Sequence, residues 1–162
     1  MRNRSTAVGA AALSLAFSGG LAVLSAGAQT PTVTTPAAPA GVTRQVDIKA
    51  TVRVRPVGLA YVGRGTFTGK PFGSGKIGTR GTTLPGSPLR VRTTITLTTR
   101  VGQVILRVTT PATGAIFRGR AAVVRGTGTY KGIKGSDLPV SISSGTPTKV
   151  RVRGTVRLPV EP

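Results

Sequence analysis

Polar and apolar residues alternate with a period of two along most of the chain beyond Arg44. In the run 45–55 the even positions are Val, Ile or Ala, whereas the odd positions are polar or charged. The run 149–157 alternates in the same way near the other end of the chain. Alternation of this kind is typical of a β-strand with one buried face and one face in solvent. Both runs are therefore predicted to be amphipathic strands.

Six further runs rich in Val, Thr and Ile lie between these two, separated by clusters of Gly, Pro and Ser. They are the runs 59–68, 76–82, 89–99, 104–110, 115–125 and 138–143. No window beyond the first part of the chain shows an apolar stripe with a helical period. The pattern predicts an all-β fold of about eight antiparallel strands, as a sandwich or a barrel. We favour the barrel, because the first and last strands would be poor exposed edges unless they paired with each other.

Two glycine-rich segments, 63–69 and 126–132, share the pattern Gly-x-Gly-Thr-aromatic-x-Gly. Glycine permits bulges and tight bends in a sheet and leaves space into which a neighbouring ring can fold. We therefore expect Phe67 and Tyr130 to be core residues at barrel corners. The alternative is that these two rings line a ligand cavity.

Two other glycine-rich strings imitate nucleotide-binding motifs. Residues 73–78 match Gly-x-Gly-x-x-Gly, but residues 79–83 that follow do not form a helix pattern, which such a site requires. Residues 65–70 are one residue too short for a P-loop, and Pro71 stands where a Ser or Thr would contact magnesium. Neither string predicts a nucleotide site.

The beginning of the chain predicts export. Residues 1–28 combine a basic start, an apolar stretch over 7–24 and Ala26-Gly27-Ala28, which is typical of a cleaved secretory signal peptide. The alternative is an uncleaved membrane anchor. Residues 29–43 are rich in Pro, Thr and Ala without charge, and predict a disordered linker before a barrel domain over 44–160. We expect a secreted protein, extracellular or associated with the cell envelope, with no membrane span after cleavage.

The chain is strongly basic, with 23 Lys and Arg residues against 3 Asp and Glu, and a formal net charge of +20. Arg predominates among the basic residues, and its planar guanidinium suits phosphate, sulfate or carboxylate groups. If the terminal strands pair, their basic residues would share one outer surface despite the cost of placing like charges opposite each other. These candidate polyanion-binding residues are Lys49, Arg53, Arg55, Lys149, Arg151, Arg153 and Arg157. The alternative is that the charge reflects solubility and genome composition.

Nucleic acid is a polyanion that such a surface could attract. Basic residues alone give binding that is independent of base sequence, whereas readers of single strands add exposed aromatic rings. Aromatic residues make up only 4% of the chain. We therefore expect no sequence-specific nucleic-acid recognition.

Reagents for catalysis are scarce in this sequence. The chain has no His and no Cys, and its only carboxylates are Asp47, Asp137 and Glu161. Too few oxygen ligands are present to predict a metal site. Tyr61 and Tyr130 could act with Asp137 in acid–base chemistry, but we predict no catalytic residue and no cofactor, which favours a non-enzyme.

Residues 126–135 resemble the Gly-Gly-Thr-Gly-x-aromatic-x-x-Ala-x-Gly segment of dirigent proteins and the related allene oxide cyclase barrels. Residues 69–75 are similar to the glycine-rich strand that precedes this segment in secreted bacterial relatives. The chain departs from the pattern at Arg125 and Ile133, and no acidic functional residue of the family matches a position here. The resemblance implies an eight-stranded, calycin-like antiparallel barrel with an apolar cavity. In the plant members that cavity steers phenoxy-radical coupling or cyclisation of fatty-acid derivatives, with little or no cofactor chemistry.

Two functions follow as expectations. The first is a secreted, non-enzymatic, highly basic β-barrel that associates electrostatically with anionic envelope or extracellular polymers. The alternative is a dirigent-like or cyclase-like barrel that holds a hydrophobic small molecule. An interior that is open would favour the second function, and one that is fully packed would exclude it.

Overall fold

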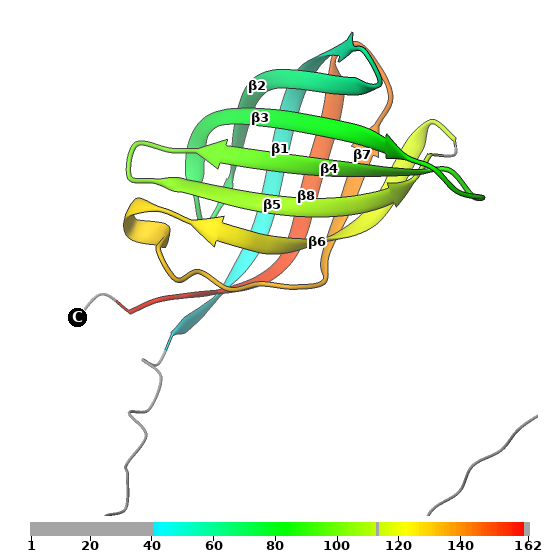
Figure 1. Ribbon diagram of the computed structural model, residues 1–162. Coiled ribbons are helices and arrows are strands. Elements are labelled where there is room, and N and C mark those ends of the chain that lie inside the picture. Colours follow the sequence, from blue (N-terminus) through cyan, green and yellow to red (C-terminus); the bar gives the residue numbers. More distant parts are fainter. Residues whose placement is uncertain (1–40, 113, 161–162) are drawn as a thin grey trace, which may run out of the picture. The chain divides into compact units, whose positions relative to one another are not determined.

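The computed structural model of the protein describes residues 41–112 and 114–160, which form a closed barrel of eight antiparallel strands (Figure 1). Each strand pairs with the next along the chain, and β8 pairs with β1 to close the barrel. The strands are β1 (Val42–Val57), β2 (Ala60–Lys70), β3 (Gly73–Leu84), β4 (Arg90–Thr98), β5 (Gln103–Pro111), β6 (Ile116–Gly126), β7 (Leu138–Ser143) and β8 (Thr148–Leu158). A short 3-10 helix, η1 (Gly128–Tyr130), lies between β6 and β7. The predicted all-β barrel is confirmed.

All eight predicted runs are strands, and their ends agree with the observed bounds to within three residues. The first strand starts earlier than expected, so Val42 and Thr43 of the predicted linker (29–43) belong to β1. The predicted signal peptide (1–28) and residues 29–40 of the predicted linker lie outside the described residues. Within the described residues, no helix has the length and apolar character needed to cross a bilayer.

The core fills most of the barrel interior. Alternate residues of every strand point inward, so that Val46, Ile48, Ala50 and Val52 of β1 are buried while Lys49 is exposed. The largest fully buried hydrophobic side chains are Phe67, Ile48, Ile95, Leu97, Leu106, Leu138, Val52, Val104, Val108 and Val152. These branched and aromatic residues come from six strands and pack into one cluster. Burial of this cluster holds the barrel together.

One end of the barrel is closed by the rings of Phe72 and Tyr130. The connections β2–β3, β4–β5 and β6–β7 lie at this end (Figure 1). The two rings meet edge to face, with centroids 5.2 Å apart and planes at 80°, and Ile133 is buried in the same cluster. The residues 126–135 thus form a corner with an aromatic plug, as predicted for Tyr130.

Phe67 is also a core residue, but the predicted corner position is wrong. It lies within β2, where it is opposite Gly75 of β3. A Cβ atom on Gly75 would come within 2.8 Å of the Phe67 ring, so the ring occupies the space that the glycine leaves. Residues 73–78 lie in β3, and the strand continues through residues 79–83. This confirms that the Gly-x-Gly-x-x-Gly string is not followed by a helix.

At Gly65 the backbones of β1 and β2 lie too close together to leave room for a side chain. A Cβ atom at Gly65 would collide with the backbone of Thr51 in β1, whereas a Cβ atom at Gly78 would have nothing within 4 Å. We expect Gly65→Ala to lower the free energy of unfolding by about 1–3 kcal/mol, since the backbone must move. Gly78→Ala should be neutral or stabilising by up to about 1 kcal/mol, because it reduces the freedom of the unfolded chain.

Denaturant unfolding followed by circular dichroism measures both variants. An unfolding free energy for Gly65→Ala equal to that of Gly78→Ala would show that the barrel wall is looser than described.

Candidate functional site

The closing seam between β1 and β8 forms a continuous outer surface with β2 and β7. Because residues that face each other across an antiparallel pair point to the same side, the register aligns outward side chains into rows. The first row, in the order β2, β1, β8, β7, is Thr68, Lys49, Arg151 and Ser141. The second row, two residues further along each strand, is Thr66, Thr51, Lys149 and Ser143. We call these eight residues the seam groove.

All eight residues of the seam groove line a depression of about 520 Å³ on the outside of the barrel. Three of them are cationic and five carry hydroxyls. Cationic groups and hydroxyls are both hydrogen-bond donors, and donors that surround a recess suit the oxygens of sulfate, phosphate or carboxylate groups. The remaining lining residues are Ala50, Phe67, Ile116 and Val150.

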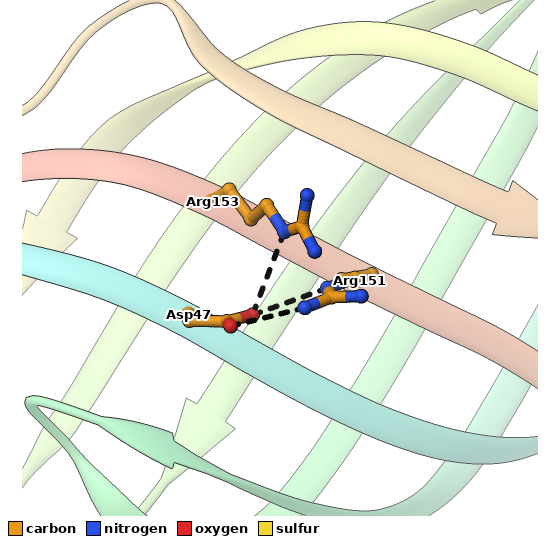
Figure 2. Close-up of polar contacts among 3 residues, drawn as sticks. All are labelled: Asp47, Arg151 and Arg153. Atoms are coloured by element: carbon orange, nitrogen blue, oxygen red, sulfur yellow. Dashed lines mark hydrogen bonds and ion pairs between the residues drawn. The ribbon is translucent and has the colours of Figure 1, made fainter.

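Asp47 is the carboxylate beside this groove. Its Oδ1 accepts a hydrogen bond from Arg151 Nε at 3.1 Å and its Oδ2 one from Arg151 Nη2 at 3.0 Å, while Arg153 Nε lies 3.8 Å away (Figure 2). The hydrogen bonds from Arg151, with the charges of Arg151, Arg153 and Lys49, hold the pKa of Asp47 below its ordinary value, and partial desolvation opposes them. Asp47 therefore stays ionised and fixes the Arg151 guanidinium along the surface.

The predicted polyanion-binding residues all lie on the outer face, but they do not form one compact patch. Lys49, Lys149 and Arg151 meet in the groove, and Arg153 lies opposite Asp47. Arg157 lies opposite Thr43 towards the closed end of the barrel. These five basic residues lie along the part of the surface where β1 pairs with β8.

Arg53 and Arg55 lie beyond the last residue of β1 that pairs with β8, and face β2 instead. Arg53 is opposite Arg64, a basic residue that the sequence reasoning had not included. From the level of Arg157 to Arg55 the surface extends about 40 Å, at about 3.3 Å per residue along β1. The predicted set is thus a long basic strip with a groove near its middle.

A second recess opens at the other end of the barrel from Tyr130, where the connections β1–β2, β3–β4, β5–β6 and β7–β8 lie (Figure 1). It has a volume of about 410 Å³ and receives side chains from all eight strands. Its lining residues are Val54, Pro56, Tyr61, Thr83, Val91, Thr110, Phe117, Ile142, Ser143, Ser144, Gly145 and Thr148. The lining is mostly apolar, and we call this recess the mouth cavity.

Tyr61 is the largest polar group of the mouth cavity. Its ring lies across Gly81, whose missing side chain leaves room for it, and its hydroxyl is hydrogen-bonded to Thr93 Oγ1. Burial raises the pKa of Tyr61 above its ordinary value, and the hydrogen bond with Thr93 offsets part of that rise. The hydroxyl is therefore neutral at physiological pH and serves to orient the ring.

Tyr130 and Phe67 were the residues proposed to line a cavity, and neither belongs to the mouth cavity. Tyr130 plugs the opposite end, where its ring packs on Phe72. Phe67 lies three residues before the end of β2 on that same side, with its ring against Gly75. Neither ring lines the mouth cavity, because Tyr130 packs at the closed end and Phe67 packs in the core.

The two described carboxylates lie on the outer surface. Asp47 and Asp137 are exposed and each pairs with arginine, Asp137 with Arg120. Neither of these two carboxylates lines the mouth cavity, so no carboxylate of the described residues lies beside Tyr61 there. Among the described residues, no group of three His, Cys, Asp or Glu side chains could hold a metal ion.

Sequence reasoning missed the hydroxyls of the seam groove and the whole mouth cavity. The hydroxyls become visible once β1 is aligned with β8, because that register places Thr51 and Lys149 opposite each other. The signal for the cavity was the pairing of Tyr61 with Gly81, a ring opposite a glycine on neighbouring strands.

Comparison with known proteins identifies no family. No protein-family model matches the chain, and no curated protein matches it at a significant level. Among solved structures, pyocyanin demethylase is similar with a TM-score of 0.42 and 20% sequence identity, over 68% of this chain and 98% of that one. We draw no conclusion about activity from a likeness of this size.

The Asp47 ion pair makes stability depend on acid pH. Because its folded pKa is lowered, Asp47 stabilises the fold above the unfolded pKa, and this contribution disappears as pH falls through the folded pKa. We expect Asp47→Asn to reduce unfolding free energy slightly between about pH 5 and pH 7, and to have no such effect at the lowest pH at which the barrel stays folded.

Denaturant titrations at each pH measure the effect, and an Arg151→Ser background should make it smaller. An effect of Asp47→Asn that stayed constant down to the lowest pH would show that the carboxylate acts through packing instead.

Proposed function

We propose that the protein is a non-enzymatic binding protein that associates electrostatically with anionic polymers of the envelope or the extracellular space. The observation that supports this most is the seam groove, a recess of about 520 Å³ in which Lys49, Lys149 and Arg151 stand among five hydroxyls. Like charges placed together on a sheet cost stability. A function that needs these charges explains why the closing strands carry them.

The chemistry of the groove favours sulfate, phosphate or carboxylate groups on a flexible chain. The rows are two residues apart, about 7 Å along the strands, and neighbouring strands are about 4.8 Å apart, so several anionic groups of one polymer can be bound together. The basic strip continues from the groove to Arg53 and Arg55 on one side and to Arg157 on the other. Release of counterions from the polymer would then drive association, and salt would oppose it.

Export of the protein, and attachment to an envelope polymer, are part of the same proposal. They rest on the signal-peptide pattern of residues 1–28 and on the clustered basic residues of the barrel.

Retention on heparin, a sulfated polysaccharide, tests the groove. We expect the wild-type protein to elute at a salt concentration well above that of the triple variant Lys49→Ser, Lys149→Ser, Arg151→Ser, because three charge contacts are lost. The matched control is Lys76→Ser, Arg107→Ser, Arg125→Ser, which removes the same charge from exposed positions on β3, β5 and β6. The control should elute between the other two proteins.

Equal elution of the two triple variants would show that net charge alone acts, and would remove the groove from the proposal. Retention that did not fall with added salt would contradict the electrostatic mechanism itself.

A second candidate function is the binding of a hydrophobic small molecule, as in dirigent-like or cyclase-like barrels. The mouth cavity favours it, because its volume of about 410 Å³ lies within the usual range for ligand sites and most of its lining surface is apolar. The packed interior limits this function to the open end, since the core cluster fills the rest of the barrel.

The neutral dye N-phenyl-1-naphthylamine tests this second function without an electrostatic contribution. We expect its fluorescence to rise on binding the wild-type protein, and to lose most of that rise with Val91→Phe, whose added ring would occupy the cavity. Val124→Phe is the control, because Val124 is exposed on β6 away from the cavity.

A wild-type protein that gave no fluorescence rise would exclude the cavity as a site for ligands of this kind. A rise that Val91→Phe left intact would place the dye elsewhere.

A further inference from the structure

The two ends of the barrel differ in charge. The connections at the open end, residues 58–59, 85–89, 112–115 and 144–147, contain no charged residue. The connections at the closed end contain Arg100, Lys131, Lys134 and Asp137. Four uncharged connections at one end are unexpected in a chain with 23 basic residues.

Exposed apolar side chains gather at the same open end. Leu59 in the β1–β2 turn is 96% exposed. Val57, Leu89 and Ile116, in or beside the connections, are 52%, 46% and 51% exposed. Val54 is also partly exposed, and it lines the mouth cavity as well. A protein that leaves apolar residues clustered in solvent usually binds something there. We call these five residues the apolar rim.

Basic residues stand directly behind the apolar rim. Arg55 lies two residues before the end of β1, Arg90 and Arg92 lie at the start of β4, and Arg118 is the third residue of β6. Two residues along a strand correspond to about 7 Å. All four side chains are exposed, and they lie on β1, β4 and β6 next to the apolar rim.

The two described carboxylates lie towards the other end. Asp47 is opposite Lys70, the last residue of β2, and Asp137 lies in the β6–β7 connection. Within the described residues, the open half of the barrel therefore carries positive charge without a carboxylate to balance it.

From this arrangement we infer that the open end of the barrel docks on an anionic lipid surface. The apolar rim enters the boundary between headgroups and acyl chains, and the four arginines bind lipid phosphates. Interfacial binding gains from buried apolar area and from attraction to anionic lipids, and the open end supplies both. A guanidinium binds phosphate oxygens through two parallel hydrogen bonds, which suits Arg for this position.

A soluble polyanion explains the arginines but leaves the apolar rim without a partner. A second copy of the chain would cover the rim, but it would bring two rings of arginine together without any described carboxylate between them. An anionic bilayer surface accommodates both features. This inference rests on the loops and strand ends of the open end, and shares only Ile116 with the lining of the seam groove and Arg55 with the basic strip.

The chain has no Trp, so a single introduced Trp reports its own surroundings. In the full chain, Leu59→Trp should show fluorescence that shifts to shorter wavelength, and is quenched by brominated lipid, when vesicles of phosphatidylcholine and phosphatidylglycerol are added. Vesicles of phosphatidylcholine alone should have little effect. Val101→Trp is the control, because Val101 is 54% exposed in the β4–β5 connection at the closed end, and its fluorescence should not change.

A second pair of variants measures affinity. We expect Leu59→Asp to weaken partition into the anionic vesicles about tenfold or more relative to Val101→Asp, which makes the same change of charge at the closed end. Both should be retained equally on heparin. This result separates lipid docking from the polymer binding of the seam groove.

Fluorescence of Leu59→Trp that did not shift, or that shifted equally in both kinds of vesicle, would overturn the inference. A shift that occurred without vesicles and grew with protein concentration would show that a second copy covers the apolar rim. Equal shifts at positions 59 and 101 would show that the open end has no special role.

Discussion

Closure of the barrel by the β1–β8 pair is the constraint on which the rest of the structure depends. It removes the two exposed edges that long amphipathic strands would otherwise present to solvent. The same closure forces like charges together, because Lys49 then lies opposite Arg151 on the outer surface. Asp47 relieves this repulsion at one place, through its two hydrogen bonds from Arg151. The charged face is thus a consequence of how the barrel closes, and its register also creates the groove that we propose as the binding site.

The two ends of the barrel have different roles for a simple topological reason. Consecutive antiparallel strands are joined at alternate ends, so every second connection lies on the same side (Figure 1). At one end the ring of Tyr130 packs against Phe72 and seals the core. At the other end the connections are short and uncharged, and they leave the mouth cavity open between them. The apolar interior therefore communicates with solvent at one end, where the apolar rim and its arginines lie.

The fold could be predicted because period-two alternation and glycine-rich turns are local properties of the sequence. The seam was also predictable, since both terminal strands needed a partner. The hydroxyls of the groove could not be predicted, because they depend on the register between Thr51 and Lys149, which are far apart in the chain. The mouth cavity could not be predicted, because its lining comes together only through the register of all eight strands. Tyr130 and Phe67 both became core residues, whereas Tyr61, which lies over Gly81, became the ring of the cavity.

The seam groove predicts that an anionic polymer binds at one place on a surface that is basic almost everywhere. Titration of the isotopically labelled protein with a short heparin oligosaccharide, followed by changes in backbone amide chemical shifts, tests it most directly. If the seam groove is the site, the largest changes fall on its four strands, around Lys49, Lys149 and Arg151, and they saturate together. Changes of similar size around Arg80, Arg107 and Arg125 on the other strands, with no common saturation, would contradict it and show that the charge attracts polymers without a site.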